Sequence, residues 1–278
     1  MAPCSVSFMR LTSVWLGPWR LWQRSHWPRR LFLLLLLGVA TLYGGLVSWH
    51  LRTPLNAGQS AFLERCRQVC LRYGLVPSGN VSRDAREYLQ AVGAQSTGSR
   101  ANRWRLDPDF TPVASQPHPL LGQPAPEFEL PDSQKRPRSL AATRARGPVV
   151  LVFYYGFQCS HCVAQLYQVD YDFGEFDKLG VQVLALCADS PEHSNRQMSR
   201  HGRFGFPLLS DADNRVAEQY GVFTPATPER DEDLQHATFV IDRGGRVAWA
   251  QRGYEPFTDN ATLLKVIAEL EPPATKPE

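Results

Sequence analysis

Two cysteines separated by two residues constrain this chain more than any other feature of its sequence. Cys159 and Cys162 directly follow an uninterrupted apolar run, residues 149–155, and precede residues 163–167, whose composition suits a helix. The pattern predicts a buried strand, a short turn and a helix that begins at the cysteine pair. A helix N-terminus carries roughly half a positive charge, which stabilises a thiolate, and two cysteines on one turn can close a short disulfide. The sequence therefore predicts thiol chemistry at this turn.

A zinc site and a pair of inert cysteines are the alternatives for Cys159 and Cys162. A structural zinc site of this kind needs a second pair at suitable spacing. The other close pair, Cys66 and Cys70, is spaced by four and lies far away in the sequence, which disfavours zinc. Inert buried cysteines are disfavoured because the turn at residues 156–158 places the pair at a surface-facing end of the strand.

The positive charge of the chain is concentrated at its N-terminus. Residues 1–30 contain no acidic residue and five arginines, which are Arg10, Arg20, Arg24, Arg29 and Arg30. The rest of the chain then has 25 basic and 27 acidic residues, a net charge of −2. A nearly neutral body lacks the basic surface that nucleic-acid binding needs, so nucleic acid is not expected as a partner. With 43% hydrophobic residues, the chain can form a packed core.

A run of 19 residues without a charged side chain, residues 31–49, follows the arginines. As a helix it would span roughly 28 Å, which matches the hydrocarbon core of a bilayer. The arginine excess before the run predicts a cytoplasmic N-terminus by the positive-inside rule. We therefore expect a single-pass membrane anchor at 31–50, with residues 118–278 in the periplasm or another extracytoplasmic space. A cleaved signal peptide is the alternative, since residues 38–40 resemble a small-x-small cleavage site.

The patterns divide the chain into five segments. They are a basic, Trp-rich cytoplasmic tail (1–30), the transmembrane helix (31–50), a helical segment of unknown role (51–95), a linker (96–117) and a compact α/β domain (118–278). Apolar spacing in the helical segment predicts helices at 59–73 and 83–92. Cys66 and Cys70 share one face of the first helix, where their Cβ atoms would be about 5–6 Å apart, beyond the roughly 3.8 Å of a disulfide. We interpret them as core-facing residues; a functional pair is the alternative if the helix ends early.

The segment at 118–278 alternates between strand and helix signals. The expected strands are 128–130, 149–155, 181–187 and 206–209, the expected helices are 159–178, 190–201, 216–220 and 261–270, and a hairpin joins 237–242 to 246–251. This order describes a sheet with helices on both faces.

Several motifs of this segment resemble the AhpC/TSA branch of the thioredoxin superfamily, which contains the redoxins and peroxiredoxins. In chain order they are GQPAPEFELPD at 122–132, VLVFY at 150–154, LALCADSPE at 184–192, DAD at 211–213, YGV at 220–222 and ATFVIDRGG at 237–245. The resemblance covers residues 118–271, a little over half of the chain. It implies a thioredoxin-like α/β fold with a central mixed sheet flanked by helices.

The chain departs from the peroxiredoxin pattern at the loop that carries the reactive cysteine. Peroxiredoxins have Pro-x-x-x-Thr-x-x-Cys there. Aligned on residues 153–154, the peroxidatic position falls on Cys162, the Thr position on Cys159 and the Pro position on Tyr155. The later Arg of the family aligns with His236. The resemblance thus implies an incomplete peroxide-binding set, with a Cys-x-x-Cys in its place.

The resemblance to thioredoxins implies a role for each residue near the pair. Cys159, the more exposed of the two, would attack a substrate disulfide, and Cys162 would resolve the mixed disulfide. His161 would add positive charge when protonated and resembles the histidine of Cys-Pro-His-Cys disulfide oxidases; a solvated helix residue is the alternative. His236 is a candidate proton relay or hydrogen-bond donor, or else an ordinary strand-end histidine. Cys187 is expected to be buried and inert.

The principal hypothesis is a membrane-anchored thiol–disulfide oxidoreductase that acts outside the cytoplasm on protein thiols or disulfides. Its electron donor or acceptor is unidentified, and both directions of electron flow are open. The first alternative is a thiol peroxidase in which Cys162 reacts with a hydroperoxide and Cys159 resolves. A copper-binding redox chaperone that uses both cysteines with His161 or His236, and a partner-binding scaffold, are the others. We expect no resident metal and no cofactor beyond the Cys159–Cys162 disulfide.

Overall fold

The computed structural model describes residues 27–52, 57–76, 78–94, 101–159 and 161–270. The chain divides into two units, Met1–Leu55 and Asn56–Glu278, which are described separately.

Helix α2 (Trp27–Arg52) is the described element of the first unit. It contains the uncharged run, and its leucines from Leu31 to Leu37 are 51–66% exposed. Among the residues that the structure describes, no helix is both long enough and apolar enough to span a bilayer. The transmembrane helix predicted at 31–50 is therefore not supported. Most of the tail predicted at 1–30 lies outside the described residues.

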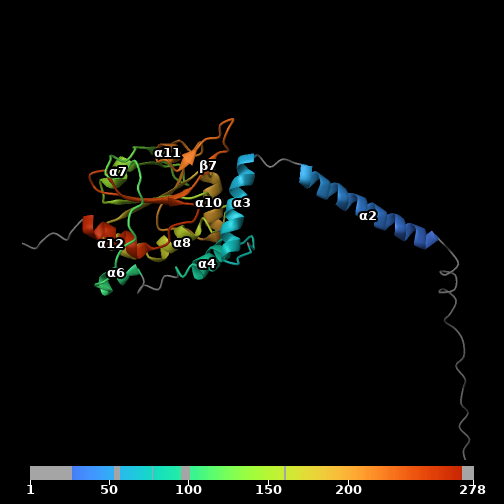
Figure 1. The fold of residues 1–278 in the computed structure, drawn as a ribbon, viewed down its shortest axis with the longest axis horizontal. Coiled ribbons are helices and arrows are strands. Elements are labelled where there is room, and N and C mark those ends of the chain that lie inside the picture. The colour runs from blue at the N-terminus through green and yellow to red at the C-terminus, as the bar shows by residue number, and fades with distance from the viewer. Residues whose placement is uncertain (1–26, 53–56, 77, 95–100, 160, 271–278) are drawn as a thin grey trace, which may run out of the picture. The chain divides into compact units, whose positions relative to one another are not determined.

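A five-stranded sheet with the order β5-β4-β3-β8-β9 forms the centre of the second unit (Figure 1). Its strands are β3 (Val149–Phe153), β4 (Gln182–Cys187), β5 (Leu208–Ser210), β8 (His236–Ile241) and β9 (Val247–Gly253). β3 pairs in parallel with β4, and β4 with β5, whereas β8 runs antiparallel to both β3 and β9. The sheet is mixed, as predicted. Every residue of β3 and β8 is buried, as expected for central strands covered on both faces.

Helices cover both faces of this sheet (Figure 1). Side chains alternate along β3, so Val150 and Val152 belong to one core and Leu151 and Phe153 to the other. The first core receives side chains from α8 (Ala164–Tyr171), α9 (Phe173–Lys178), α10 (Pro191–His201) and α12 (Asn260–Leu270). The second core receives them from α7 (Leu140–Arg144) and α11 (Arg215–Gln219).

The structure differs from the expected elements in several short segments. The helix predicted at 159–178 begins only at Ala164 and is broken into α8 and α9 at Asp172, a residue type that favours helix ends. The predicted linker contains a short helix, α6 (Arg103–Leu106). Predicted strand 128–130 is β1 (Glu129–Pro131), which pairs with an unpredicted β2 (Pro137–Ser139). A second small pair, β6 (Phe223–Thr224) with β7 (Asp233–Leu234), was also not predicted.

Two helices that precede the sheet, α3 (Ala57–Arg72) and α4 (Val81–Ala91), pack against it. Asn80 caps α4 by accepting a hydrogen bond from the Arg83 amide. Val69 of α3 and Tyr88 of α4 belong to the same core as Val150 of β3. The helical segment is therefore part of the second unit and covers one end of its sheet.

Candidate active site

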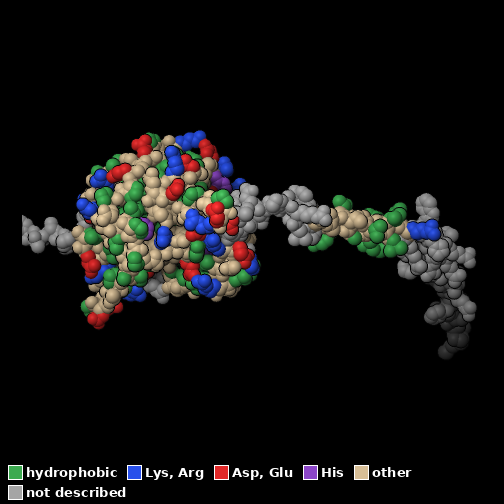
Figure 2. Space-filling model, turned by 45° about the horizontal axis from the view of Figure 1, so that its top comes forward, with side chains coloured by type: hydrophobic (Ala, Val, Ile, Leu, Met, Phe, Trp, Pro, Cys, Tyr) green, Lys and Arg blue, Asp and Glu red, His purple; other side chains and the backbone are tan. Residues whose placement is uncertain are grey.

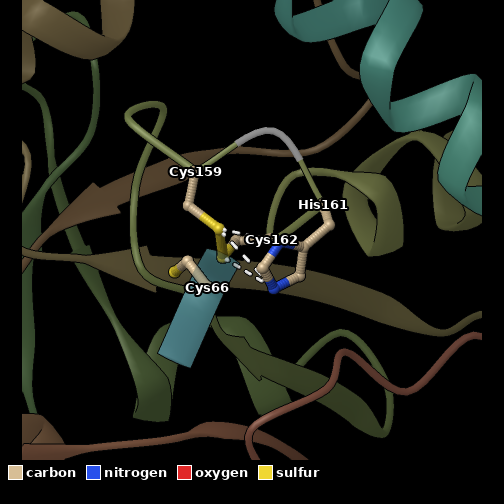
Figure 3. A group of neighbouring side chains, drawn as sticks. All are labelled: Cys66, Cys159, His161 and Cys162. Atoms are coloured by element: carbon tan, nitrogen blue, oxygen red, sulfur yellow. Dashed lines mark hydrogen bonds between the residues drawn. A yellow bond between two sulfur atoms is a disulfide. The ribbon is translucent and has the colours of Figure 1, made fainter. Parts of the chain in front are cut away.

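Cys159 and Cys162 form a disulfide in the loop between β3 and α8 (Figure 3). The Cys162 amide donates a hydrogen bond to the Cys159 carbonyl, and the Ala164 amide to the His161 carbonyl, each at 3.1 Å. These i to i+3 bonds form a tight turn that precedes the helix. The prediction that the helix begins at Cys159 was therefore wrong, because the cysteine pair occupies the turn before it.

The disulfide is buried, with Cys159 only 4% and Cys162 0% exposed. The sequence predicted a surface-facing pair, and this was wrong. Two helices that precede the AhpC/TSA-like region provide the cover: Cys66 of α3 packs against the cluster of Cys159, Cys162 and Tyr155. Tyr88 of α4 lies against His161, with 5.5 Å between the ring centroids.

His161 lies beside the disulfide and is only 1% exposed. Its Nδ1 is 3.3 Å from the Cys159 sulfur, and its Nε2 is 3.6 Å from the Cys162 sulfur. The Cys70 sulfur is 3.5 Å from the same Nδ1. Burial lowers the pKa of His161 to about 4, so the imidazole is neutral at pH 7. It therefore acts as a hydrogen-bonding group at the sulfurs, and it carries no positive charge there at this pH.

His236, the first residue of β8, approaches the pair from the sheet. Its ring centroid is 4.4 Å from that of Tyr155 and 6.2 Å from that of His161. Burial lowers the pKa of His236 well below its usual value and His161 adds to this, while the Phe153 backbone acts in the opposite direction. Neither ring nitrogen has a hydrogen-bond partner of ordinary geometry among the described residues. The contact with the Phe153 backbone is therefore a weak hydrogen bond of this buried ring.

A cavity of about 380 Å³ reaches His236 from the surface. The residues that line this cavity include Val69 and Arg72 of α3, Thr238 of β8 and Phe257. Of the four predicted site residues, the one that lines this cavity is His236. On the face shown in Figure 2, basic and acidic side chains are interspersed over the second unit.

The Cys66 sulfur joins the disulfide and His161 in one compact group (Figure 3). The three sulfurs and a ring nitrogen of His161 all lie within 4.8 Å of one another. Sulfur and imidazole ligands suit soft metal ions. Two of these sulfurs are bonded to each other, however, so the group can bind a metal only after the disulfide is reduced.

The remaining described cysteines lie in different environments. Cys187 on β4 is buried, as predicted, and burial raises the pKa of its thiol well above the usual range. Cys66 is partly buried, and burial followed by the neighbouring Cys70 raises the pKa of its thiol to about 12. Burial also raises the pKa of Cys70. None of the three is in a disulfide.

The structure brings all four predicted site residues, Cys159, His161, Cys162 and His236, into one cluster. The sequence analysis missed the contributions of Cys66 and Tyr88. Cys66 and Cys70 were assigned to a core-facing side of their helix, and that side does face the interior. The apolar pattern of α3 contained no sign that its partner would be the redox centre.

Replacing Tyr88 with alanine should loosen the cover of the redox centre. Tyr88 is 1% exposed and makes an edge-to-face contact with Tyr73. Removing a buried aromatic side chain costs about 3–5 kcal/mol. Since α4 lies over His161, we expect local opening, with reduced Cys159 alkylated roughly a hundredfold faster than in the wild type. Tyr171→Ala, at a position that is 57% exposed, is the control; equal alkylation rates in all three proteins would contradict the role of α4 as a cover.

Comparisons with known proteins agree with this architecture. The model of the AhpC/TSA family matches residues 121–250. The chain is 31% identical to the chloroplastic peroxiredoxin Q of Sedum lineare, over 54% of this chain and 78% of the relative. It is 32% identical to peroxiredoxin Bcp of Escherichia coli K12, over 45% of this chain and 81% of the relative.

Solved structures give similar matches. The crystal structure of peroxidoxin BcpB from Mycobacterium tuberculosis matches with a TM-score of 0.49 and 28% identity, covering 57% of this chain and all of that one. The crystal structure of a protein described as a putative thiol:disulfide interchange protein DsbE, from Chlorobium tepidum, matches with a TM-score of 0.44 and 22% identity. The match covers 54% of this chain and 96% of that one. The mixed five-stranded sheet with helices on both faces, together with the peroxiredoxin relatives, confirms the predicted thioredoxin-like α/β fold.

Proposed function

This chain belongs to the AhpC/TSA family of thiol-dependent oxidoreductases, and we propose that it catalyses thiol–disulfide exchange through Cys159 and Cys162. The observation that carries the proposal is the disulfide between these residues, in the loop after β3 and beside two buried histidines. The disulfide takes up two electrons when it opens to a dithiol and releases them when it closes again, so no further cofactor is required.

The proposed reaction in the reducing direction has two steps. The Cys159 thiolate attacks a substrate disulfide; a mixed disulfide forms and the first substrate thiolate leaves. The Cys162 thiolate then attacks the Cys159 sulfur, which closes the Cys159–Cys162 disulfide and releases the second substrate thiolate. Two electrons pass from the dithiol to the substrate, and an external thiol donor restores the dithiol. The oxidising direction reverses these steps.

The surroundings of the pair suggest what each neighbour contributes. A neutral His161 can donate an N–H hydrogen bond to a thiolate of either cysteine, since its ring nitrogens lie within 3.6 Å of both sulfurs. His236, buried where the cavity meets β8, can accept or return a proton there. Because Cys159 is 4% exposed, we propose a low-molecular-weight disulfide or an extended peptide as the substrate that reaches it without displacing α3.

A thiol peroxidase is the second candidate, favoured by the peroxiredoxins among the relatives. In this reaction the Cys162 thiolate attacks a hydroperoxide, forming a sulfenic acid and releasing an alcohol or water. The Cys159 thiol then condenses with the sulfenic acid, forming the disulfide and a second water. The positions of the family's Thr and Arg hold Cys159 and His236, which weakens this candidate.

The two candidates differ in how the dithiol protein reacts with two oxidants. We would mix it separately with glutathione disulfide and hydrogen peroxide, and follow the thiols of Cys159 and Cys162 beside the same protein in denaturant. Thiol–disulfide exchange predicts a Cys159–Cys162 disulfide with glutathione disulfide, while peroxide reacts no faster with folded than with denatured protein. A far faster peroxide reaction of the folded protein would replace this proposal with the peroxidase.

A location at a membrane, with residues 118–278 outside the cytoplasm, is proposed from the sequence. The sequence features behind it are the uncharged run at residues 31–49 and the arginines before that run. The full-length protein should stay with the membrane fraction after alkaline carbonate extraction. Recovery in the supernatant would rule out stable anchoring by α2.

A further inference from the structure

Cys66 is a thiol at this site that the AhpC/TSA family match does not include. It lies on α3, outside residues 121–250, and its sulfur is within 4.8 Å of both sulfurs of the disulfide. It is in the thiol form and only partly buried, whereas Cys159 and Cys162 are buried. A free thiol at this distance from a disulfide is placed for exchange after a small approach.

We propose that Cys66 is a third redox-active cysteine. It exchanges with the Cys159–Cys162 disulfide, so that a disulfide between Cys66 of α3 and Cys159 replaces it. This inference rests on the proposed thiol–disulfide exchange and extends it. It assigns a role to a helix that lies outside the family fold, because α3 then provides a reacting group as well as a cover.

The exchange step conserves atoms and electrons. The Cys66 sulfur attacks the Cys159 sulfur, the more exposed of the two in the disulfide. A Cys66–Cys159 bond forms, the Cys159–Cys162 bond breaks, and Cys162 leaves with the electron pair. The proton lost by the Cys66 thiol ends on the Cys162 sulfur. No external oxidant or reductant takes part.

His161 is placed to move that proton. Its ring belongs to the same compact group as Cys66, and its Nε2 is 3.6 Å from the Cys162 sulfur that leaves. The raised pKa of Cys66 means that its thiol carries a proton at neutral pH, so proton transfer has to accompany the attack. A neutral imidazole has one donor and one acceptor nitrogen and can serve both sulfurs.

The transfer would make a buried disulfide available to partners. As a whole residue Cys66 is less buried than the pair, although it is buried within the sulfur cluster. Two ion pairs that hold α3 lie near the surface. Arg65 pairs with Asp233, and Arg72 pairs with Glu255, with each of these side chains at least a quarter exposed. Ion pairs of this kind contribute little stability, so the cost of displacing α3 lies mainly in exposing its buried Val69 and Cys70. A disulfide on Cys66 would be exposed by that displacement.

Cys70 provides a matched control on the same helix. Its sulfur contacts His161, but it is not part of the group formed by Cys66, Cys159, His161 and Cys162. One helical turn separates it from Cys66, a spacing at which a disulfide within an intact helix is disfavoured.

The test uses the full chain with Cys162→Ser, which leaves Cys159 and Cys66 to react. The reduced protein is treated with glutathione disulfide in the presence of a chelator, which removes bound metal ions, and its disulfides are mapped by mass spectrometry. We expect a Cys66–Cys159 disulfide as the major product, also with Cys70→Ser added. With Cys66→Ser added, Cys159 should instead carry glutathione.

Two outcomes would overturn the inference, and they are distinguishable. Stable glutathionylated Cys159 beside a free Cys66 would refute the exchange while leaving the proposed function intact. No reaction of Cys159 in any variant would refute the proposed function and the exchange together. A second measurement avoids the Cys162 substitution: the oxidised wild-type protein is quenched in acid and its thiols are alkylated at low pH. A fraction with alkylated Cys162 and a Cys66–Cys159 bond should be present, retained in Cys70→Ser and lost in Cys66→Ser.

Discussion

Replacing Cys159 with serine should lower the rate of disulfide exchange by roughly three orders of magnitude or more, since a serine hydroxyl is a far weaker nucleophile than a thiolate and forms no disulfide. The fold should survive, because the change is nearly isosteric at a position beside a turn. The rate is measured as the protein-catalysed reduction of glutathione disulfide in the presence of an excess of a dithiol donor. A thermal unfolding curve of each protein checks that the fold is intact.

The matched control for this change is Cys187→Ala. Cys187 is buried on β4 and lies outside the redox centre, so the variant should keep the wild-type rate and lose only a small part of the stability. If Cys159→Ser kept a tenth or more of the wild-type rate, Cys159 would not be the attacking group. Equal losses in both variants would instead indicate a general disturbance of the fold.

Acidification should destabilise the protein strongly between about pH 6.5 and pH 4. The folded pKa of His161 is about 4, lowered by burial, whereas the unfolded chain has an ordinary imidazole with a pKa of 6.5. The unfolded state therefore binds more protons in this range, and the free energy of unfolding falls as the pH falls. The difference between the two pKa values corresponds to a contribution of about 3 kcal/mol from His161 to the free energy of unfolding. This contribution is fully present above pH 6.5 and is lost by pH 4. His236, whose pKa is also lowered, acts in the same direction.

Denaturant unfolding at several pH values tests this expectation. The loss of stability between pH 6.5 and 4.5 should shrink when His161 is replaced with asparagine, because the group that binds the extra proton in the unfolded chain is gone. A wild-type protein as stable at pH 4.5 as at pH 7 would show that His161 is not held neutral by burial.

Local patterns in the sequence were sufficient for much of this fold. The continuous apolar run at 149–155 predicted a strand buried on both faces, which is β3. The strand–turn–cysteine pattern and the family motifs placed Cys159 and Cys162 beside His236. These features depend on neighbours in the sequence, or on motifs that the family shares.

The cover of the site could not be predicted in the same way. Cys70 meets His161 across 91 positions of sequence, and Tyr88 packs on the same ring. An apolar helix face shows that something is buried, but the sequence does not show against what. The buried position of Cys159 and the neutral state of His161 both follow from this long-range packing.

The central claim is that Cys159 and Cys162 form a reversible two-electron redox pair, and a redox titration tests it most directly. The full-length protein would be equilibrated in buffers of graded glutathione potential, quenched in acid and alkylated, and each cysteine would be counted by mass spectrometry. We predict one transition with the slope of a two-electron couple, in which Cys159 and Cys162 change state together while Cys187 stays a thiol. A pair that remains a disulfide, or remains two thiols, at every potential tested would contradict the claim.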